Sequence, residues 1–229
     1  MYYYDSTYIL VIIAFILSLI ASFGVKSAFA KYDKVYSRRG ITGAEAARKI
    51  LDANGLTNIR IERVSGELSD HFDPRSNVVR LSDSTYSSSS VAAIGVAAHE
   101  CGHAVQHAVG YVPIRVRNSI VPIVNIGNTL SMPLFFLGLV LQMFNLAFIG
   151  AMLFGLVLVF QIATLPVEFN ASSRAIKILD NMGILDSDEM SGTKKVLTAA
   201  AMTYVAAVAS TALQLLRLLL ILNNNRRRD

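Results

Sequence analysis

Three long stretches of this chain contain no charged side chain, and about 20 apolar residues are what a helix needs to cross a membrane. They are residues 8–25, 118–143 and 146–165. The chain is 53% hydrophobic and only 16% charged, with a mean hydropathy of +0.48, so it is far more apolar than an ordinary soluble domain. The sequence therefore predicts an integral membrane protein of mainly α class, with three to four transmembrane helices.

The first stretch is either a retained membrane anchor or a signal peptide that is cleaved. A signal peptide carries positive charge ahead of its apolar core. Here Asp5 precedes the core, and the first basic residue, Lys26, follows it. We therefore expect residues 1–25 to be a transmembrane anchor. Only the polar turn 142–145 separates the other two stretches, so residues 118–165 are predicted to form a transmembrane hairpin.

Basic residues next to the first three stretches all mark one side of the membrane: Lys26, Lys31, Lys34, Arg38, Arg39, Arg115, Arg117, Arg174 and Lys177. Because basic loops stay on the cytoplasmic side, residues 26–117 and 166–195 are predicted to be cytoplasmic. A fourth apolar stretch, residues 196–222, contains Gln214 and Arg217, and the sequence leaves open whether it crosses the membrane. The segment 196–229 ends in a basic tail, Arg226 to Arg228. This tail would be cytoplasmic, as the rule for basic residues requires, only if the stretch 196–222 does not cross the membrane.

The chain has a net charge of +5, and most of its basic residues lie beside apolar segments rather than gathered on one face of a domain. This placement favours a lipid bilayer as the partner surface and argues against a nucleic-acid partner. The single cysteine, Cys101, excludes an internal disulfide.

The polar segment 26–117 contains the pattern of a small α+β domain. Residues 42–56 are predicted to form a helix that begins at a capping box of Thr42 and Glu45. Alternation predicts one strand over residues 59–64, and a turn over residues 73–77 is followed by a second, short predicted strand over 78–81. The second strand lies either inside the sheet, which is favoured, or at its edge, where it could pair with an extended peptide.

One motif carries the chemistry: His99-Glu100-Cys101-Gly102-His103, in a helix predicted to begin near Val91. Two histidines four residues apart share a helical face, about 6 Å apart along the axis, so both can bind one metal ion. The preceding residues are apolar, and a buried cluster of this kind needs a partner that a metal supplies. Zinc lowers the pKa of a bound water to about 7. Glu100 is therefore predicted to accept the proton of the attacking water as general base.

A catalytic zinc site takes three protein ligands and keeps one position open. His107 is too distant, since it lies about 12 Å from His99 along a continuing helix. His71 lies in a turn-rich segment and is a weaker candidate. Glu168 follows the hairpin, which returns the chain to the side of the membrane it left. Spacing alone leaves open whether Glu168 is a ligand or a solvated residue in the first turn of a helix.

The order of anchor, His-Glu-x-x-His helix, transmembrane hairpin and Glu-bearing helix resembles the bacterial YugP-type membrane zinc metallopeptidases. More distantly, it is similar to the HtpX and Ste24 class of gluzincins. The matching stretches, which with the apolar segments cover nearly the whole chain, are Leu68–Arg75, Ala92–Gln106 and Leu165–Ala175. The resemblance implies a zincin-like catalytic domain, one Zn²⁺ per chain, Glu100 as general base, and three zinc ligands: His99, His103 and Glu168.

The chain departs from the HtpX-like pattern at one position. That class usually carries an Asp four residues after the ligand Glu, where this chain has Ser172. A hydrogen bond from Asn170 or Ser172 could orient a zinc-binding histidine in its place. For the group that stabilises the oxyanion, the sequence offers only three candidates: Tyr204, Arg174 and His107.

The sequence thus predicts a zinc-dependent metalloendopeptidase that cleaves membrane or membrane-adjacent polypeptides at the cytoplasmic side of the bacterial plasma membrane. Two alternatives stay open. A true intramembrane protease would hold residues 91–112 in the bilayer, yet such enzymes usually take a third ligand from a later Asp, and none lies between Asp83 and Asp180. A membrane scaffold or metal-binding pseudoenzyme would have no use for Glu100 beside an open ligand position.

Overall fold

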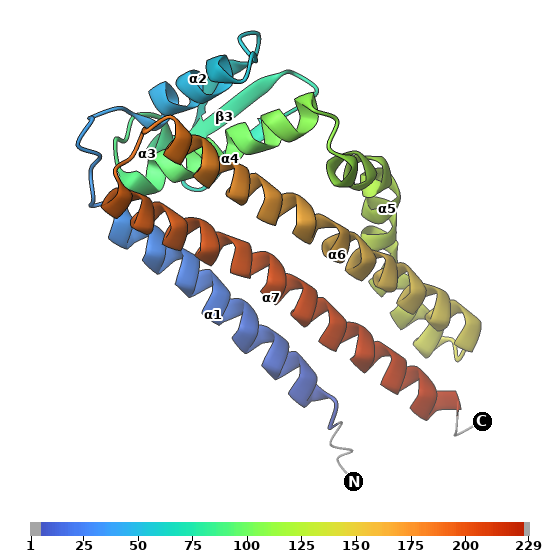
Figure 1. The fold of residues 1–229 in the computed structure, drawn as a ribbon. Coiled ribbons are helices and arrows are strands. Elements are labelled where there is room, and N and C mark those ends of the chain that lie inside the picture. Colours follow the sequence, from blue (N-terminus) through green and yellow to red (C-terminus); the bar gives the residue numbers. More distant parts are fainter. Residues whose placement is uncertain (1–5, 227–229) are drawn as a thin grey trace. The chain divides into compact units, whose positions relative to one another are not determined.

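The computed structural model describes residues 6–226, and within them two compact units (Figure 1). A helical unit contains the described residues up to Ser22, residues 116–165, and those from Thr203 onward. A mixed unit contains residues 23–115 and 166–202. Arg227 and Arg228 of the predicted basic tail lie outside the described residues.

The mixed unit contains a small sheet of three strands: β1 (Arg60–Val64), β2 (His71–Asp73) and β3 (Val78–Ser82). Their order is β1-β3-β2, with β1 parallel and β2 antiparallel to β3. The prediction that β3 lies inside the sheet is confirmed. The short strand β2 was not predicted, because its three residues lie in a turn-rich segment and become a strand only through pairing with β3, where Phe72 lies opposite Val79.

Three shorter helices lie wholly within this unit: α2 (Gly43–Ala53), α3 (Asp83–Tyr86) and α4 (Val91–Ala108). The predicted capping box starts α2, since Thr42 accepts from the Glu45 N–H at 3.2 Å and Glu45 accepts from the Thr42 N–H at 2.8 Å. One apolar face of α2 packs against α4. Ser90 caps α4 by accepting from the Ala93 N–H at 3.1 Å.

Within the described residues, four helices are long and apolar enough to cross a membrane: α1 (Tyr8–Tyr32), α5 (Val112–Val140), α6 (Phe144–Asn181) and α7 (Ser187–Arg226). The hairpin turn falls between α5 and α6. The second arm does not end where its apolar stretch ends, because α6 continues through Pro166 to Asn181. The fourth apolar stretch lies wholly inside α7. The predicted fold class, a mainly α membrane protein with a small α+β domain, is confirmed.

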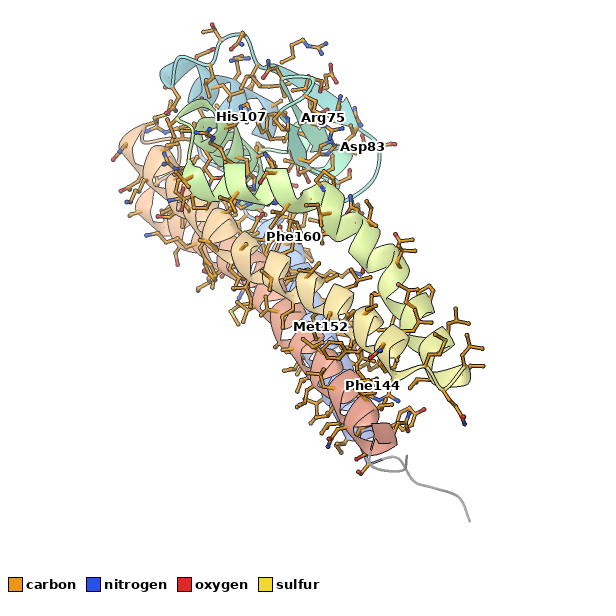
Figure 2. The ribbon with its side chains drawn as sticks, turned by 90° about the vertical axis from the view of Figure 1, so that its right-hand side faces the viewer. Arg75, Asp83, His107, Phe144, Met152 and Phe160 are labelled. Atoms are coloured by element: carbon orange, nitrogen blue, oxygen red, sulfur yellow. The ribbon has the colours of Figure 1, made fainter. Side chains whose placement is uncertain are left out.

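The helical unit shows the packing expected of membrane helices. Gly138 lies against the backbone of Ala147, and Gly150 lies against that of Phe135, so that α5 and α6 approach closely. Along the first part of α6, apolar side chains such as Phe144 and Met152 point outward (Figure 2). Exposed apolar side chains of this kind suit contact with lipid.

Within the mixed unit, the end of α6 and the start of α7 both pack on α4 through small residues. A Cβ on Gly102 would lie 2.7 Å from the carbonyl oxygen of Ala171 in α6. A Cβ on Gly95 would lie 2.7 Å from the Thr193 methyl group of α7. The Thr193 hydroxyl also donates to the carbonyl of Val91 at 2.8 Å. The two glycines therefore let both helices lie directly on the helix that carries the His-Glu-x-x-His motif.

Candidate metal centre

His99 and His103 on α4 and Glu168 on α6 come together in the mixed unit. Their ligand atoms all lie within 4.8 Å of one another. Among the described residues this is the one group of three or more His, Cys, Asp or Glu side chains with such spacing. The two imidazoles are 15% and 12% exposed and the carboxylate is 3% exposed, so the cluster is largely shielded from water.

The spacing within this cluster suits a shared ion better than direct hydrogen bonds. Oε2 of Glu168 lies 3.4 Å from Nε2 of His99 and 3.5 Å from Nε2 of His103. A charge-assisted hydrogen bond between such groups is about 2.7–2.9 Å long. Ligands placed about 2.0–2.1 Å from a tetrahedral zinc ion are about 3.3–3.4 Å apart. The donor set of two imidazoles and one carboxylate therefore fits zinc in both chemistry and spacing.

Both imidazoles also make a contact through Nδ1, the ring nitrogen that does not face Glu168. Nδ1 of His99 lies 3.1 Å from the Ser172 hydroxyl, and Nδ1 of His103 lies 3.0 Å from the side-chain oxygen of Gln106. When each Nδ1 donates a hydrogen bond, each Nε2 keeps its lone pair for the cluster. Ser172 thus stands where a hydrogen bond to a histidine was expected, whereas Asn170 contacts Gln106 instead.

Glu100 lies between the two histidines in sequence but outside the ligand cluster. Its side chain is buried, with the residue 8% exposed, and its Oε2 accepts a hydrogen bond from the backbone N–H of Phe72 at 3.0 Å. Phe72 belongs to β2, which is an edge strand of the sheet. The carboxylate is therefore held by β2, a strand that the sequence pattern did not predict.

Comparison with known proteins identifies the family. Residues 7–223 match the family described as "Putative neutral zinc metallopeptidase". The chain belongs to this family. It is also 49% identical over 208 residues to a protein of Bacillus subtilis (strain 168) named "Putative membrane protease YugP", covering 91% of this chain and 92% of that protein. No solved structure matches the chain.

The family description specifies zinc, and the electrostatics of the cluster favour a cation. Burial disfavours the charged imidazolium of His103, but the neighbouring carboxylates of Glu168 and Glu100 outweigh it, so the pKa of His103 lies above its ordinary value. The same carboxylates that would stabilise a proton on this ring would stabilise a metal ion in its place. Protons and zinc therefore compete for this position.

The remaining histidine candidates are not part of the cluster. His107 is exposed near the end of α4 (Figure 2). Its ring packs edge-on against that of Phe72, with the ring centroids 5.9 Å apart. His71 is also exposed and contacts Arg80. Of the three oxyanion candidates, Arg174 lies over the ring of Tyr111, and Tyr204 belongs to the helical unit. Within the described residues, neither His107 nor His71 joins the metal cluster.

Cys101, the cysteine inside the motif, contacts α2 and is not part of the metal cluster. Cys101 is fully buried against α2, and its thiol donates to the carbonyl of Ala47 at 3.6 Å. Burial, reinforced by the negative charge of Glu100, holds the pKa of this thiol well above its ordinary value. Cys101 therefore acts as a small apolar core residue that joins α4 to α2.

Proposed function

We propose that this protein is a membrane-embedded zinc endopeptidase that hydrolyses peptide bonds of membrane or membrane-adjacent polypeptides. The observation that carries the proposal is the arrangement of three zinc-compatible ligand atoms with the carboxylate of Glu100 beside them but outside the ligand set. A purely structural zinc site uses four protein ligands, whereas three ligands and a nearby base are typical of a hydrolase.

In the proposed mechanism, His99, His103 and Glu168 hold one zinc ion per chain. A zinc ion bound there would supply Lewis acidity, which would make a peptide carbonyl more electrophilic and lower the pKa of water toward neutrality. Glu100 accepts the proton of the attacking water and then returns it to the leaving amine. The Phe72 N–H holds one oxygen of Glu100 and leaves the other for this proton transfer.

Strand β2 supports the assignment of a polypeptide substrate. It is an edge strand, and the N–H of Phe72 is taken by the catalytic carboxylate rather than by β3. An extended polypeptide added along this edge would lie beside Glu100. Residues 78–81, the strand expected to take this role if it lay at the edge, instead form the central strand β3.

The packing of α4 favours this function over intramembrane proteolysis. Most of α4 is buried by protein, with α2 and the sheet packed against it. In the described part of the chain, α4 is not among the helices that qualify as membrane spans. We therefore propose that catalysis takes place at the membrane surface. We propose the cytoplasmic side of the bacterial plasma membrane, because basic residues flanking apolar stretches favour that side.

Metal removal tests the proposal. The full chain, purified in detergent, is expected to cleave a quenched-fluorescent unfolded casein, to lose this activity after dialysis against a zinc chelator, and to regain it when about one equivalent of zinc is added. A His99→Ala variant purified in parallel controls for contaminating proteases and should show no zinc-dependent cleavage. Cleavage by the wild-type protein that survives chelation, or that the variant retains, would contradict the proposal.

A further inference from the structure

A buried glutamine connects the two helices that carry the ligand cluster. Gln106 on α4 is fully buried, which is unusual for this residue type. Its side-chain oxygen lies 3.0 Å from Nδ1 of His103. Its side-chain nitrogen donates to the carbonyl of Val167 at 2.8 Å and to the side-chain oxygen of Asn170 at 3.0 Å. Val167 and Asn170 lie on either side of Glu168 in α6.

The neighbours of this amide determine its orientation. The carbonyl of Val167 can only accept a hydrogen bond, so it must face the nitrogen of Gln106. The guanidinium of Arg174 can only donate, and its Nε donates to the oxygen of Asn170 at 2.8 Å. That oxygen therefore also faces the Gln106 nitrogen. Two independent contacts thus direct the oxygen of Gln106 toward His103.

The orientation of the amide in turn fixes the proton on His103. Because the Gln106 oxygen accepts hydrogen bonds and cannot donate them, Nδ1 of His103 must carry the hydrogen. In the neutral imidazole, Nε2 then keeps its lone pair, and this nitrogen is the one that faces Glu168 at 3.5 Å. The opposite tautomer would place two acceptors, Nδ1 of His103 and the Gln106 oxygen, 3.0 Å apart. It would also put the hydrogen on Nε2, the nitrogen that faces the other ligands and must be free to bind a metal.

We propose that Gln106 is the positioning residue of the zinc centre, which holds His103 in the metal-binding tautomer and ties it to the turn of α6 that carries Glu168. The zinc part of this inference rests on the proposed function. Loss of a contact that orients a zinc-binding histidine typically weakens metal affinity about 10-fold to 100-fold. One amide here serves both ligand-bearing helices, so its loss affects two of the three ligands.

The test compares two substitutions of Gln106. Gln106→Met keeps the size of the side chain and removes all three hydrogen bonds, so the zinc dissociation constant, measured by competition with a chelating dye, should rise about 10-fold to 100-fold. Gln106→Glu keeps an acceptor for His103 but turns its second oxygen toward two acceptor oxygens of α6, so the zinc dissociation constant should rise in this variant as well. Gln161→Met, which changes a glutamine outside the mixed unit, should leave zinc affinity unchanged.

The tautomer of His103 gives a second readout that needs no variant. Nitrogen NMR of histidine-labelled, metal-free wild-type protein at alkaline pH should show Nδ1 of His103 protonated and Nε2 unprotonated. A proton on Nε2 would overturn the inference, as would zinc affinity in Gln106→Met within twofold of wild type. Because this spectrum is recorded without zinc, failure of the protein to bind zinc would refute the proposed function while the tautomer still tests Gln106.

Discussion

Replacing Glu100 by glutamine is expected to leave zinc bound while lowering kcat by about 10²-fold to 10⁴-fold, the range that general acid–base catalysis supplies. The glutamine has nearly the same shape, and its oxygen can still accept from the Phe72 N–H that holds Glu100 at 3.0 Å. It cannot accept the proton of the attacking water. Zinc content and cleavage of the unfolded casein, measured on the same preparation, separate these two effects.

The matched control for this substitution is Glu67→Gln, which removes an exposed carboxylate outside the cluster. It should retain both zinc and full activity. Equal activity of Glu100→Gln and wild type would refute the role of Glu100 as base. Loss of zinc together with activity in Glu100→Gln would show that Glu100 acts on the metal site itself rather than on the proton.

Replacing Gly102 by alanine is expected to disrupt the metal centre without touching any ligand. The new Cβ would lie 2.7 Å from the carbonyl oxygen of Ala171 and 3.3 Å from two other backbone atoms of this residue. A helix backbone cannot move aside as a flexible side chain can, so α6 must shift away from α4. Overpacking of this kind costs about 1–3 kcal/mol. The shift carries Glu168 and Ser172 away from the two histidines, so zinc affinity should fall at least about tenfold.

Gly24→Ala provides the control for this effect. Gly24 lies inside α1, and a Cβ there meets nothing within 4 Å. Because alanine favours a helix more than glycine does, this variant should be neutral or slightly more stable. The measurements are the thermal unfolding midpoint and the zinc dissociation constant of both variants. Wild-type zinc affinity in Gly102→Ala would show that α6 does not need this close approach to deliver Glu168.

The parts of the site that depend on local sequence could be predicted. The His99 and His103 pair follows from helical geometry alone, because residues four positions apart share a face. The start of α2 follows from a capping box within four residues. The membrane helices follow from uncharged length, which needs no knowledge of what packs against them.

The parts that depend on tertiary contact could not be predicted from spacing. Glu168 reaches the histidines where α6 approaches α4 closely at Gly102, and nothing in the spacing of these residues reveals that contact. The apolar stretch that ends at residue 165 gives no indication that its helix continues through Pro166. Strand β2 exists through its pairing with β3, so the contact between Phe72 and Glu100 was not foreseen.

One contact of Gln106 could be predicted from local sequence, and the others could not. It lies three residues after His103, so the two side chains share a face of α4, and this spacing could have indicated their hydrogen bond. Its partners on α6 are more than 60 residues away along the chain. Its second role, toward the turn that carries Glu168, could be seen only in the fold.

The central claim is that His99, His103 and Glu168 form one zinc centre, and metal analysis of the purified protein tests it most directly. The wild-type chain and Glu100→Gln should each contain about one zinc per chain, because both keep the three ligands. Glu168→Gln, which removes the shared carboxylate with little change in shape, should contain almost none after the same purification. Full zinc occupancy in Glu168→Gln, or its absence from the wild-type protein, would contradict this account.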